Sequence, residues 1–348
     1  MLFLKTSTTR TDSPPKKERS ASRVFLSILF FLFMAVAIFT WLSPVPISLM
    51  IRAAFNNNTA VPPKNYEELK QRVTVVENLC YPSEYRDNEA DIYIPKDRKG
   101  PFPVVLWIHG GAFVGGDKED VKIYATALAA EGFAVVCMNY RRAPEAKYPV
   151  PIIQTGEVYQ WIRGISGVYS LDINRFFLAG DSAGAHIAAQ FAAVQSNADY
   201  AAEMGFGQIV PLHTLRAALL FCGPFDVAGI GKSSNAVINV LMKRAAWAYF
   251  GTKGFNEHLT EQATISNCVT SRFPPVFITD GNYLSFEEHG RNLADTLDKS
   301  GVFVETYFIS ADFEKTGHEY QFIMNTPAGE ESFLQVIHFL KKHINDQM

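Results

Sequence analysis

The sequence has only four cysteines among its 348 residues, and they lie far apart. None forms a Cys-x-x-Cys pair or a cluster with histidine, so the spacings that are typical of zinc sites are absent. Four thiols are also too few for a disulfide-dense scaffold. We therefore expect all four to be free thiols that are buried by packing: Cys80, Cys137, Cys222 and Cys268.

The chain also has little net charge. It contains 32 lysine and arginine residues against 35 aspartate and glutamate residues, which gives −3 at pH 7. This balance lacks the basic excess that binds polyanions, so nucleic acid is not an expected partner. With 48% hydrophobic and 19% charged residues, the composition is that of a packed protein and excludes wholesale disorder and fibrous repeats.

The N-terminal region has few acidic residues and then no charge at all. Residues 1–23 carry six lysines and arginines against Asp12 and Glu18, and residues 24–42 are uncharged. A helix of that length, at about 1.5 Å per residue, spans the roughly 30 Å hydrocarbon core of a bilayer. We therefore predict a basic tail at 1–23, a transmembrane signal-anchor helix at 24–42 and a juxtamembrane connector at 43–72.

The basic tail also predicts the orientation of this helix. Positive residues stay on the cytoplasmic side of a membrane, so we expect a single-pass protein with a cytoplasmic N-terminus, an extracytoplasmic domain after the connector and the lipid bilayer as a partner. The alternative is a cleavable signal peptide, whose apolar region is usually about 7 to 15 residues long and is followed by small residues. Trp41, Pro44 and Pro46 follow here instead, which favours an uncleaved anchor.

From residue 73 onward, short apolar runs alternate with segments of helical length. Continuous apolar strands separated by helices are typical of a mostly parallel sheet that is covered on both faces. We predict an α/β domain at 73–348, with a helical insert at about 227–268, where the connection is too long for an ordinary loop. The expected strands are 73–81, 91–94, 104–108, 134–140, 176–179, 217–221, 276–279 and 302–309, and the expected helices are 121–131, 152–165, 183–195, 286–300 and 331–343.

A nucleophile motif follows the fifth expected strand. Residues 180–184 read Gly-Asp-Ser-Ala-Gly, between the strand RFFLAG and the helix AHIAAQFAAVQ. In this strand-turn-helix context, Gly-x-Ser-x-Gly forms a sharp nucleophile elbow that leaves the serine hydroxyl exposed at the helix N-terminus. Ser182 is therefore the predicted nucleophile. The alternative is that Ser182 only caps the helix.

A second glycine motif follows the third expected strand. Residues 109–113 read His-Gly-Gly-Ala-Phe, a turn of the kind that presents backbone N–H groups to a developing oxyanion. Glycine suits such a turn because the backbone has to approach the substrate closely and to adopt positive φ. We predict that the N–H groups of Gly110, Gly111 and Ala183 form an oxyanion hole. The alternative is a glycine turn without a catalytic role.

The general base is expected late in the chain, because the order in this architecture is serine, acid, histidine. Four of the eight histidines follow the seventh expected strand. His289, His338 and His343 fall within expected helices, where a solvated or partly packed imidazole is the ordinary outcome. His318, in the loop after the eighth strand, is the predicted base.

These motifs together resemble the hormone-sensitive-lipase-like α/β-hydrolases, which are carboxylesterases and lipases. The resemblance implies an α/β-hydrolase fold, with a mostly parallel eight-stranded sheet and a helical cap after the sixth strand. Ala112 and Ala185 replace glycines of the family pattern, which is expected to tighten the pocket. The matching segments, spread over residues 73–345, are HGGAF at 109–113, YRRAPE at 140–145, GDSAG at 180–184 and GHEYQF at 317–322.

The acid departs from the family pattern. The family has an Asp-Pro-Leu turn after the seventh strand, whereas Asp280 ends that strand here and no Asp-Pro follows. We predict Asp280 as the acid because it is nearest to the expected place. Glu288 has the spacing of a helix capping box with Ser285, and Glu287 suits the positive end of the same helix. Asp226, after the sixth strand, is the main alternative acid.

The predicted reaction is the hydrolysis of a small or medium acyl ester. Ser182 attacks the carbonyl, His318 accepts its proton and returns it to the leaving alcohol, and the carboxylate orients the imidazole. This chemistry requires no metal or cofactor. A serine peptidase or amidase of the same fold is a second hypothesis, and a catalytically inactive, membrane-tethered interaction protein is a third.

The apolar stripe of the insert has two interpretations. Its residues recur at helical spacing, so they either wall an acyl pocket or pack on the core. The stripe comprises Val237, Leu241, Met242, Ala246, Trp247 and Phe250.

Overall fold

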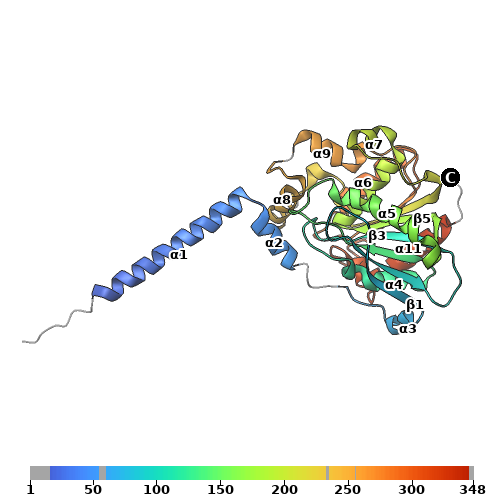
Figure 1. Ribbon diagram of the computed structural model, residues 1–348, viewed down its shortest axis with the longest axis horizontal. Coiled ribbons are helices and arrows are strands. Elements are labelled where there is room, and N and C mark those ends of the chain that lie inside the picture. Colours follow the sequence, from blue (N-terminus) through green and yellow to red (C-terminus); the bar gives the residue numbers. More distant parts are fainter. Residues whose placement is uncertain (1–15, 55–59, 233–234, 255, 345–348) are drawn as a thin grey trace, which may run out of the picture. The chain divides into compact units, whose positions relative to one another are not determined.

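The computed structural model describes residues 16–54, 60–232, 235–254 and 256–344. The chain forms two compact units, Met1–Pro46 and Ile47–Met348. In the first unit the main described element is helix α1 (Lys16–Leu42), which extends into the predicted basic tail (Figure 1). Its segment Ala21–Leu42 contains an 18-residue window with a mean hydropathy of 2.5 and is long and apolar enough to cross a membrane. A signal sequence near an N-terminus has the same two properties.

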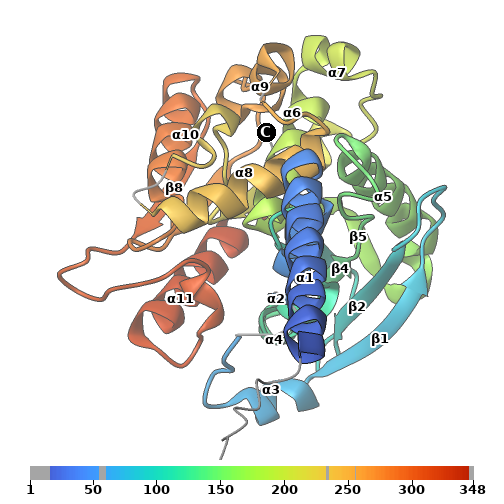
Figure 2. The ribbon, with the colours of Figure 1, turned by 90° about the vertical axis from the view of Figure 1, so that its left-hand side faces the viewer.

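The second unit is built around an eight-stranded sheet in the order β1-β2-β4-β3-β5-β6-β7-β8. Figure 2 shows the edge strand β1 beside β2. The first two pairings, β1 with β2 and β2 with β4, are antiparallel, and all others are parallel. The predicted α/β-hydrolase architecture is therefore confirmed. The strands are β1 (Val73–Cys80), β2 (Glu89–Pro95), β3 (Phe102–Ile108), β4 (Ala134–Met138), β5 (Leu171–Asp181), β6 (Leu215–Phe221), β7 (Val276–Asp280) and β8 (Val304–Phe308).

Helices cover both faces of this sheet because alternate residues of each central strand point to opposite sides. In β3, Leu106 and Ile108 pack in the larger core cluster, together with α5 (Val150–Tyr169), α6 (Ala183–Ser196) and α10 (Glu287–Lys299). Trp107, between them, packs on the other face with α4 (Lys122–Ala130) and α11 (Pro327–His343). The remaining α-helices of this unit are α2 (Val45–Ala54), α3 (Tyr66–Gln71) and α7 (Ala198–Met204), with α8 (Ala236–Phe250) and α9 (Glu257–Ala263) in the predicted insert between β6 and β7.

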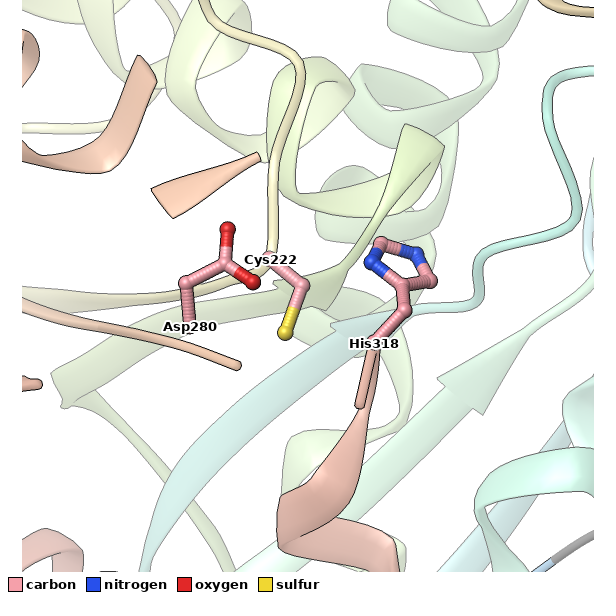
Figure 3. A group of neighbouring side chains, drawn as sticks. All are labelled: Cys222, Asp280 and His318. Atoms are coloured by element: carbon pink, nitrogen blue, oxygen red, sulfur yellow. The ribbon is translucent and has the colours of Figure 1, made fainter. Parts of the chain in front are cut away.

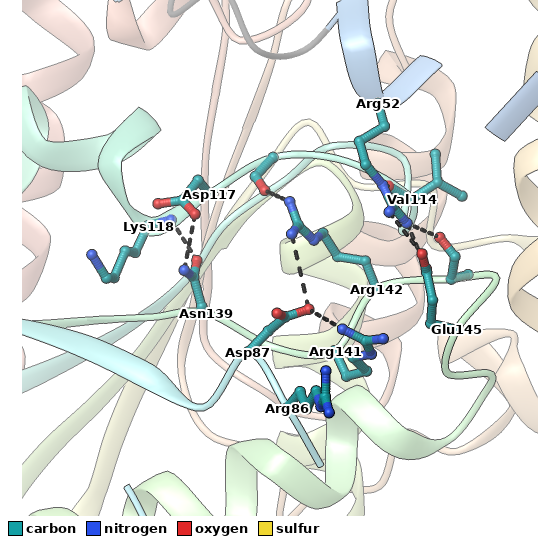
Figure 4. A network of polar contacts seen from close by, with 12 residues as sticks. Arg52, Arg86, Asp87, Val114, Asp117, Lys118, Asn139, Arg141, Arg142 and Glu145 are labelled. Carbon is teal, nitrogen blue, oxygen red and sulfur yellow. Dashed lines mark hydrogen bonds and ion pairs between the residues drawn. The ribbon is translucent and has the colours of Figure 1, made fainter. Parts of the chain in front are cut away.

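Arg52, near the end of α2, joins three segments of the second unit (Figure 4). Its Nε donates to the carbonyl of Val114 at 2.6 Å, and its Nη2 donates to the carbonyl of Ala143 at 2.7 Å. The two terminal nitrogens also bind both carboxylate oxygens of Glu145, at 2.9 and 2.6 Å. Because Ile51 is buried in the core, this helix turn is an integral part of the hydrolase domain.

The four cysteines are free, as predicted. Cys137, Cys222 and Cys268 are buried, whereas Cys80 is exposed. The prediction of burial is therefore wrong for Cys80. It is the last residue of the edge strand β1, where only one neighbouring strand is present to cover it.

Candidate active site

Ser182 lies in a tight turn between β5, which ends at Asp181, and α6, which begins at Ala183. Its φ is 50°, in the left-handed region that non-glycine residues rarely adopt. The flanking glycines make this turn possible. A Cβ at Gly180 would lie 2.4 Å from the carbonyl oxygen of Gly184, and a Cβ at Gly184 would lie 2.0 Å from the carbonyl oxygen of Ile108. The geometry is that of a nucleophile elbow.

The predicted base lies beside this serine. His318 Nε2 is 2.9 Å from Ser182 Oγ, although the two residues are 136 positions apart in the sequence. Burial lowers the pKa of His318 to about 4, so the imidazole is neutral at pH 7 and able to accept a proton. The structure therefore brings the predicted nucleophile and base into hydrogen-bond contact.

The other candidate histidines are placed differently. His289 of α10 lines the same cavity, but its Nδ1 accepts a hydrogen bond from the backbone N–H of Asp226 at 3.2 Å. His343 packs against Phe339 and Phe303 at the end of α11. His338 is an exposed residue of the same helix. Among the described histidines, His318 is the one whose side chain is hydrogen-bonded to the hydroxyl of Ser182.

Asp280 is next to the base but reaches it through a third residue. Cys222, Asp280 and His318 lie together, with one polar atom from each within 4.8 Å of the other two (Figure 3). Among the described residues, however, the hydrogen-bond partner of His318 Nδ1 is Ser285 Oγ, at 2.7 Å. The same hydroxyl donates to Asp280 Oδ1. Ser285 therefore connects the carboxyl group of Asp280 to the imidazole.

This finding corrects the interpretation of Ser285 as a capping residue. Helix α10 has Phe286 as its N-cap and no side-chain cap, because the Ser285 hydroxyl is engaged by Asp280 and His318. Sequence reasoning missed Ser285 as a site residue. Its place in the loop after β7, five positions beyond Asp280, is compatible with a helix cap and with a link between Asp280 and His318. The spacing to Glu288 favours the capping box.

Burial also changes the protonation of Asp280. It raises the pKa of this carboxyl group to about 7, against the opposing effect of hydrogen bonds from Ser285, Cys222 and the backbone N–H of Gly281. The Gly281 N–H donates to Asp280 Oδ1 at 2.7 Å. The carboxyl group is therefore held in place by its neighbours rather than by a basic side chain.

The alternative acids do not contact the base. Glu287 forms an ion pair with Arg291 at 2.6 Å, one turn further along α10. Glu288 and Asp226 line the cavity in front of Ser182. Among the carboxylates weighed from the sequence, Asp280 alone is linked to His318 Nδ1 through the hydrogen bonds of the described residues.

The glycine motif after β3 lies against the elbow, but its first N–H is already engaged. The backbone N–H of Gly110 donates to Asp181 Oδ2 at 2.7 Å. The prediction that Gly110 is an oxyanion donor is therefore wrong for this structure, because a group that donates to a buried carboxylate does not face a substrate. Gly111 and Ala112 follow, with φ of 107° and 53°, and Ala112 lines the cavity beside Ser182.

Ala183 fits its predicted place. It is the first residue of α6, so its N–H has no acceptor within the helix. It follows the serine directly, which is where an elbow supplies one oxyanion donor. Of the predicted donors, the N–H groups of Gly111 and Ala183 remain, and the N–H of Ala112, which sequence reasoning did not include, is a further candidate for the hole.

A cavity of about 570 Å³ opens in front of Ser182 and His318. The insert supplies part of its wall through Ile238, Asn239 and Met242 of α8, while Val237 of the same helix is exposed. Met242 and Ala246 also line a second, smaller apolar cavity that touches Ser182 and Ala183. Part of the predicted apolar stripe thus forms the cavity wall. The larger cavity is also lined by Ala112, Asp226, Gly229, Gly231, Lys232, Leu284, Ser285, Phe286, Glu288, His289 and Asn292.

The fold and the arrangement of the site define an α/β-hydrolase with a serine at its nucleophile elbow. Comparison with known proteins identifies the family: the BD-FAE family model matches residues 90–284, and the chain belongs to this family. The resemblance to hormone-sensitive-lipase-like esterases is likewise confirmed.

Two curated relatives carry esterase names. The chain is 36% identical over 115 residues to "Probable isoprenylcysteine alpha-carbonyl methylesterase ICME" of Oryza sativa subsp. japonica, a match that covers 33% of this chain and only 28% of the rice protein. It is 29% identical over 223 residues to "Carboxylesterase NlhH" of Mycobacterium tuberculosis, which covers 63% of this chain and 68% of the relative.

Solved structures support the fold. Esterase B from Lactobacillus rhamnosis superimposes with a TM-score of 0.72, covering 86% of this chain and 96% of the other at 18% identity. A protein described as bacterial heroin esterase superimposes with a TM-score of 0.64, covering 82% and 95% at 20% identity. At these identities the likeness is one of architecture.

Proposed function

We propose that this chain is a serine carboxylic-ester hydrolase in which Ser182 is the nucleophile and His318 the general base. The observation that carries the proposal is the 2.9 Å contact between Ser182 Oγ and His318 Nε2 at a nucleophile elbow. In the first step, Ser182 Oγ attacks the ester carbonyl carbon while its proton passes to Nε2. His318 then passes this proton to the leaving alcohol. In the second step His318 takes a proton from the water that attacks the acyl-enzyme and returns it to Ser182.

Two groups of residues support this chemistry. The backbone N–H groups of Gly111, Ala112 and Ala183 stabilise the oxyanion that forms in each tetrahedral intermediate. Ser285 accepts the Nδ1–H of His318 and donates its own hydroxyl proton to Asp280, which fixes the imidazole tautomer. The acid of a Ser-His-Asp triad thus acts through an intervening hydroxyl.

The substrate class follows from the cavity. A space of about 570 Å³ suits an ester with a small or medium acyl group, and it has both apolar and hydrogen-bonding walls. The relatives named as a carboxylesterase and as a methylesterase point to the same bond type. We further propose that helix α1 anchors the protein as a single-pass membrane protein with an extracytoplasmic domain.

The central experiment replaces Ser182 by alanine in the full-length protein. Ser182→Ala should abolish hydrolysis of p-nitrophenyl butyrate and labelling by a fluorophosphonate probe, at an unchanged melting temperature. Ser166→Ala, on the surface of α5, is the matched control and should retain both. Near-normal hydrolysis by Ser182→Ala would remove the proposal.

A substrate panel separates this function from the alternatives. Methyl esters, short acyl esters and peptide amides are compared at one enzyme concentration. Turnover confined to the amides would identify a peptidase, and the absence of both labelling and turnover would identify an inactive interaction protein.

A further inference from the structure

Glu319 follows the base directly, yet the proposed reaction does not use it. Its φ is 59°, a left-handed conformation that persists for glutamate only where the surroundings fix it. Its backbone N–H donates to Cys222 Sγ at 3.3 Å, and its carbonyl accepts a hydrogen bond from the Phe322 N–H at 3.1 Å. These bonds fix the direction of the Glu319 side chain.

The Glu319 carboxyl group meets Asp181, the residue before the nucleophile. The two carboxyl groups are within hydrogen-bonding reach of each other. A Cβ added to Gly110 would lie 2.5 Å from Asp181 Oδ2 and 2.9 Å from Glu319 Oε1. Both carboxyl groups therefore lie on the same side of this glycine. Asp181 accepts two more hydrogen bonds, from Trp107 Nε1 and from the Gly110 N–H, each at 2.7 Å. The histidine loop, the elbow and the glycine turn therefore converge on this carboxyl pair.

A hydrogen bond between two carboxyl groups requires a proton, because a carboxylate can only accept. Burial raises the pKa of Glu319 well above its usual range and raises the pKa of Asp181 to about 6. Among the described residues, no basic side chain forms an ion pair with Asp181. The basic side chain within ion-pair distance of Glu319 is that of His318. The titratable groups around the pair are Asp120, Asp280, Cys137, Cys222, Tyr140 and His318.

We propose that Glu319 is a positioning residue which, through a proton shared with Asp181, ties the histidine loop to the nucleophile elbow and the glycine turn. The inference rests on the ester hydrolysis proposed above. The shared proton keeps Asp181 in place to accept from the Gly110 N–H. The direction of that peptide sets where the next N–H groups, those of Gly111 and Ala112, point.

The same proton keeps Glu319 uncharged beside the base. Glu319 Oε1 lies 3.7 Å from His318 Nε2. An ionised carboxylate at that distance would favour a protonated Nε2 paired with Glu319, and a protonated Nε2 cannot accept the proton of Ser182. A neutral Glu319 leaves His318 free to serve Ser182.

Two substitutions separate a shared proton from simple packing. The side-chain amide of Glu319→Gln donates to Asp181 as the carboxylic O–H does, whereas Glu319→Ala has no donor. Glu319→Ala should lower kcat/KM for p-nitrophenyl butyrate about 100-fold, the loss expected when reacting groups shift by about 1 Å. Glu319→Gln should recover most of that loss. Glu331→Ala, on the exposed surface of α11, is the control and should match the wild type.

The pH dependence of activity distinguishes a shared proton from simple packing, because a packing role alone would not change it. As pH rises, the wild type should lose activity when the pair gives up its shared proton, because two adjacent carboxylates repel and Glu319 becomes an anion beside His318. Glu319→Gln has no such proton and should stay active over the same range. An identical alkaline fall in both proteins would overturn the proposal, as would a glutamine variant as defective as the alanine variant.

Infrared spectroscopy tests the shared proton without any substrate. The wild type should show C=O stretching bands of buried protonated carboxylic acids, and Glu319→Gln should lose the component of this pair while the component of Asp280 remains. If the bands are unchanged, the proton is not on this pair and the proposal fails. Because this measurement needs no activity, it still decides the matter if Ser182→Ala refutes ester hydrolysis or if Glu319→Ala does not fold.

Discussion

Ser285 stands where the acid of a serine hydrolase usually meets the imidazole. Its hydroxyl accepts from His318 Nδ1 and donates to Asp280, so orientation of the ring depends on two hydrogen bonds in series. Each bond polarises the next in a buried environment. Because a hydroxyl carries no charge, any negative charge that acts on the imidazole lies on Asp280, one residue further away. The three residues should therefore behave as one unit.

A double-mutant cycle tests this unit. Ser285→Ala and Asp280→Asn should each lower turnover by about 100-fold or more, because either change leaves the imidazole without its oriented tautomer. The double variant should be no worse than the poorer single variant, since the second change removes a link that is already broken. Melting temperatures confirm that each variant is folded.

Glu288→Gln is the matched control for this cycle. It changes a carboxylate in the first turn of α10 that lines the cavity but does not touch His318, so turnover should be near normal. Asp226→Asn should likewise leave the base oriented. Losses that multiply in the double variant would mean that Asp280 acts independently of Ser285, and a crippled Asp226→Asn would move the acid to the loop after β6.

At the level of elements, local patterns in the sequence were sufficient for most of the sheet. Apolar runs such as Val104–Ile108 predict strands because both faces of the strand are buried. β5 begins at Leu171, five residues before the predicted start, and the reason is physical. Its first half contains Asp172, Asn174 and Arg175, which are partly or fully exposed and hide the strand pattern.

The site was predictable only where it is local in the sequence. The elbow around Ser182 and the glycine turn each occupy about five consecutive residues, so their geometry is encoded in their own sequence. The contacts that corrected the prediction join distant segments. Gly110 donates to Asp181 across 71 positions, and Ser285 meets His318 across 33. No local pattern reports such partners.

Helix α2 offers a prediction at the level of an element. Arg52 pairs with Glu145 through two hydrogen bonds, and this pairing lowers the pKa of Glu145 to about 2. Arg52 also holds the carbonyl of Val114, two residues after Ala112. Arg52→Ala should lower the free energy of unfolding by about 1–3 kcal/mol, as measured by urea unfolding, because these charge-assisted bonds are lost.

Arg52→Lys distinguishes geometry from charge. A lysine keeps the positive charge but cannot bind a carboxylate in the two-pronged manner of arginine, so it should restore only a small part of the stability. Lys64→Ala, which removes an exposed ion pair with Glu330, is the control and should have little effect. Full stability in Arg52→Lys would show that charge alone matters.

For the whole molecule, the testable property is topology. If α1 spans a membrane with its basic end in the cytoplasm, protease added to intact cells should digest the domain after Leu42 and spare residues 1–23. Antibodies against the two ends of the chain give the readout. Cells opened by detergent are the control, because both ends should then be accessible.

The opposite pattern would reverse the orientation. A domain protected in intact cells and digested only after lysis would place the hydrolase in the cytoplasm. Release of the domain into the medium with a new N-terminus would instead show that the helix is a cleaved signal peptide.

If α1 anchors the protein as proposed, its apolar surface also determines which substrate concentration the hydrolase responds to. No residue in the apolar window of Ala21–Leu42 is buried, and the proposed anchoring would place this segment in a bilayer. A hydrolase held in this way diffuses in two dimensions. For an ester that dissolves in lipid, the rate then follows the mole fraction of substrate in the membrane, and adding inert lipid slows turnover by surface dilution even when the amount of ester in the sample is constant.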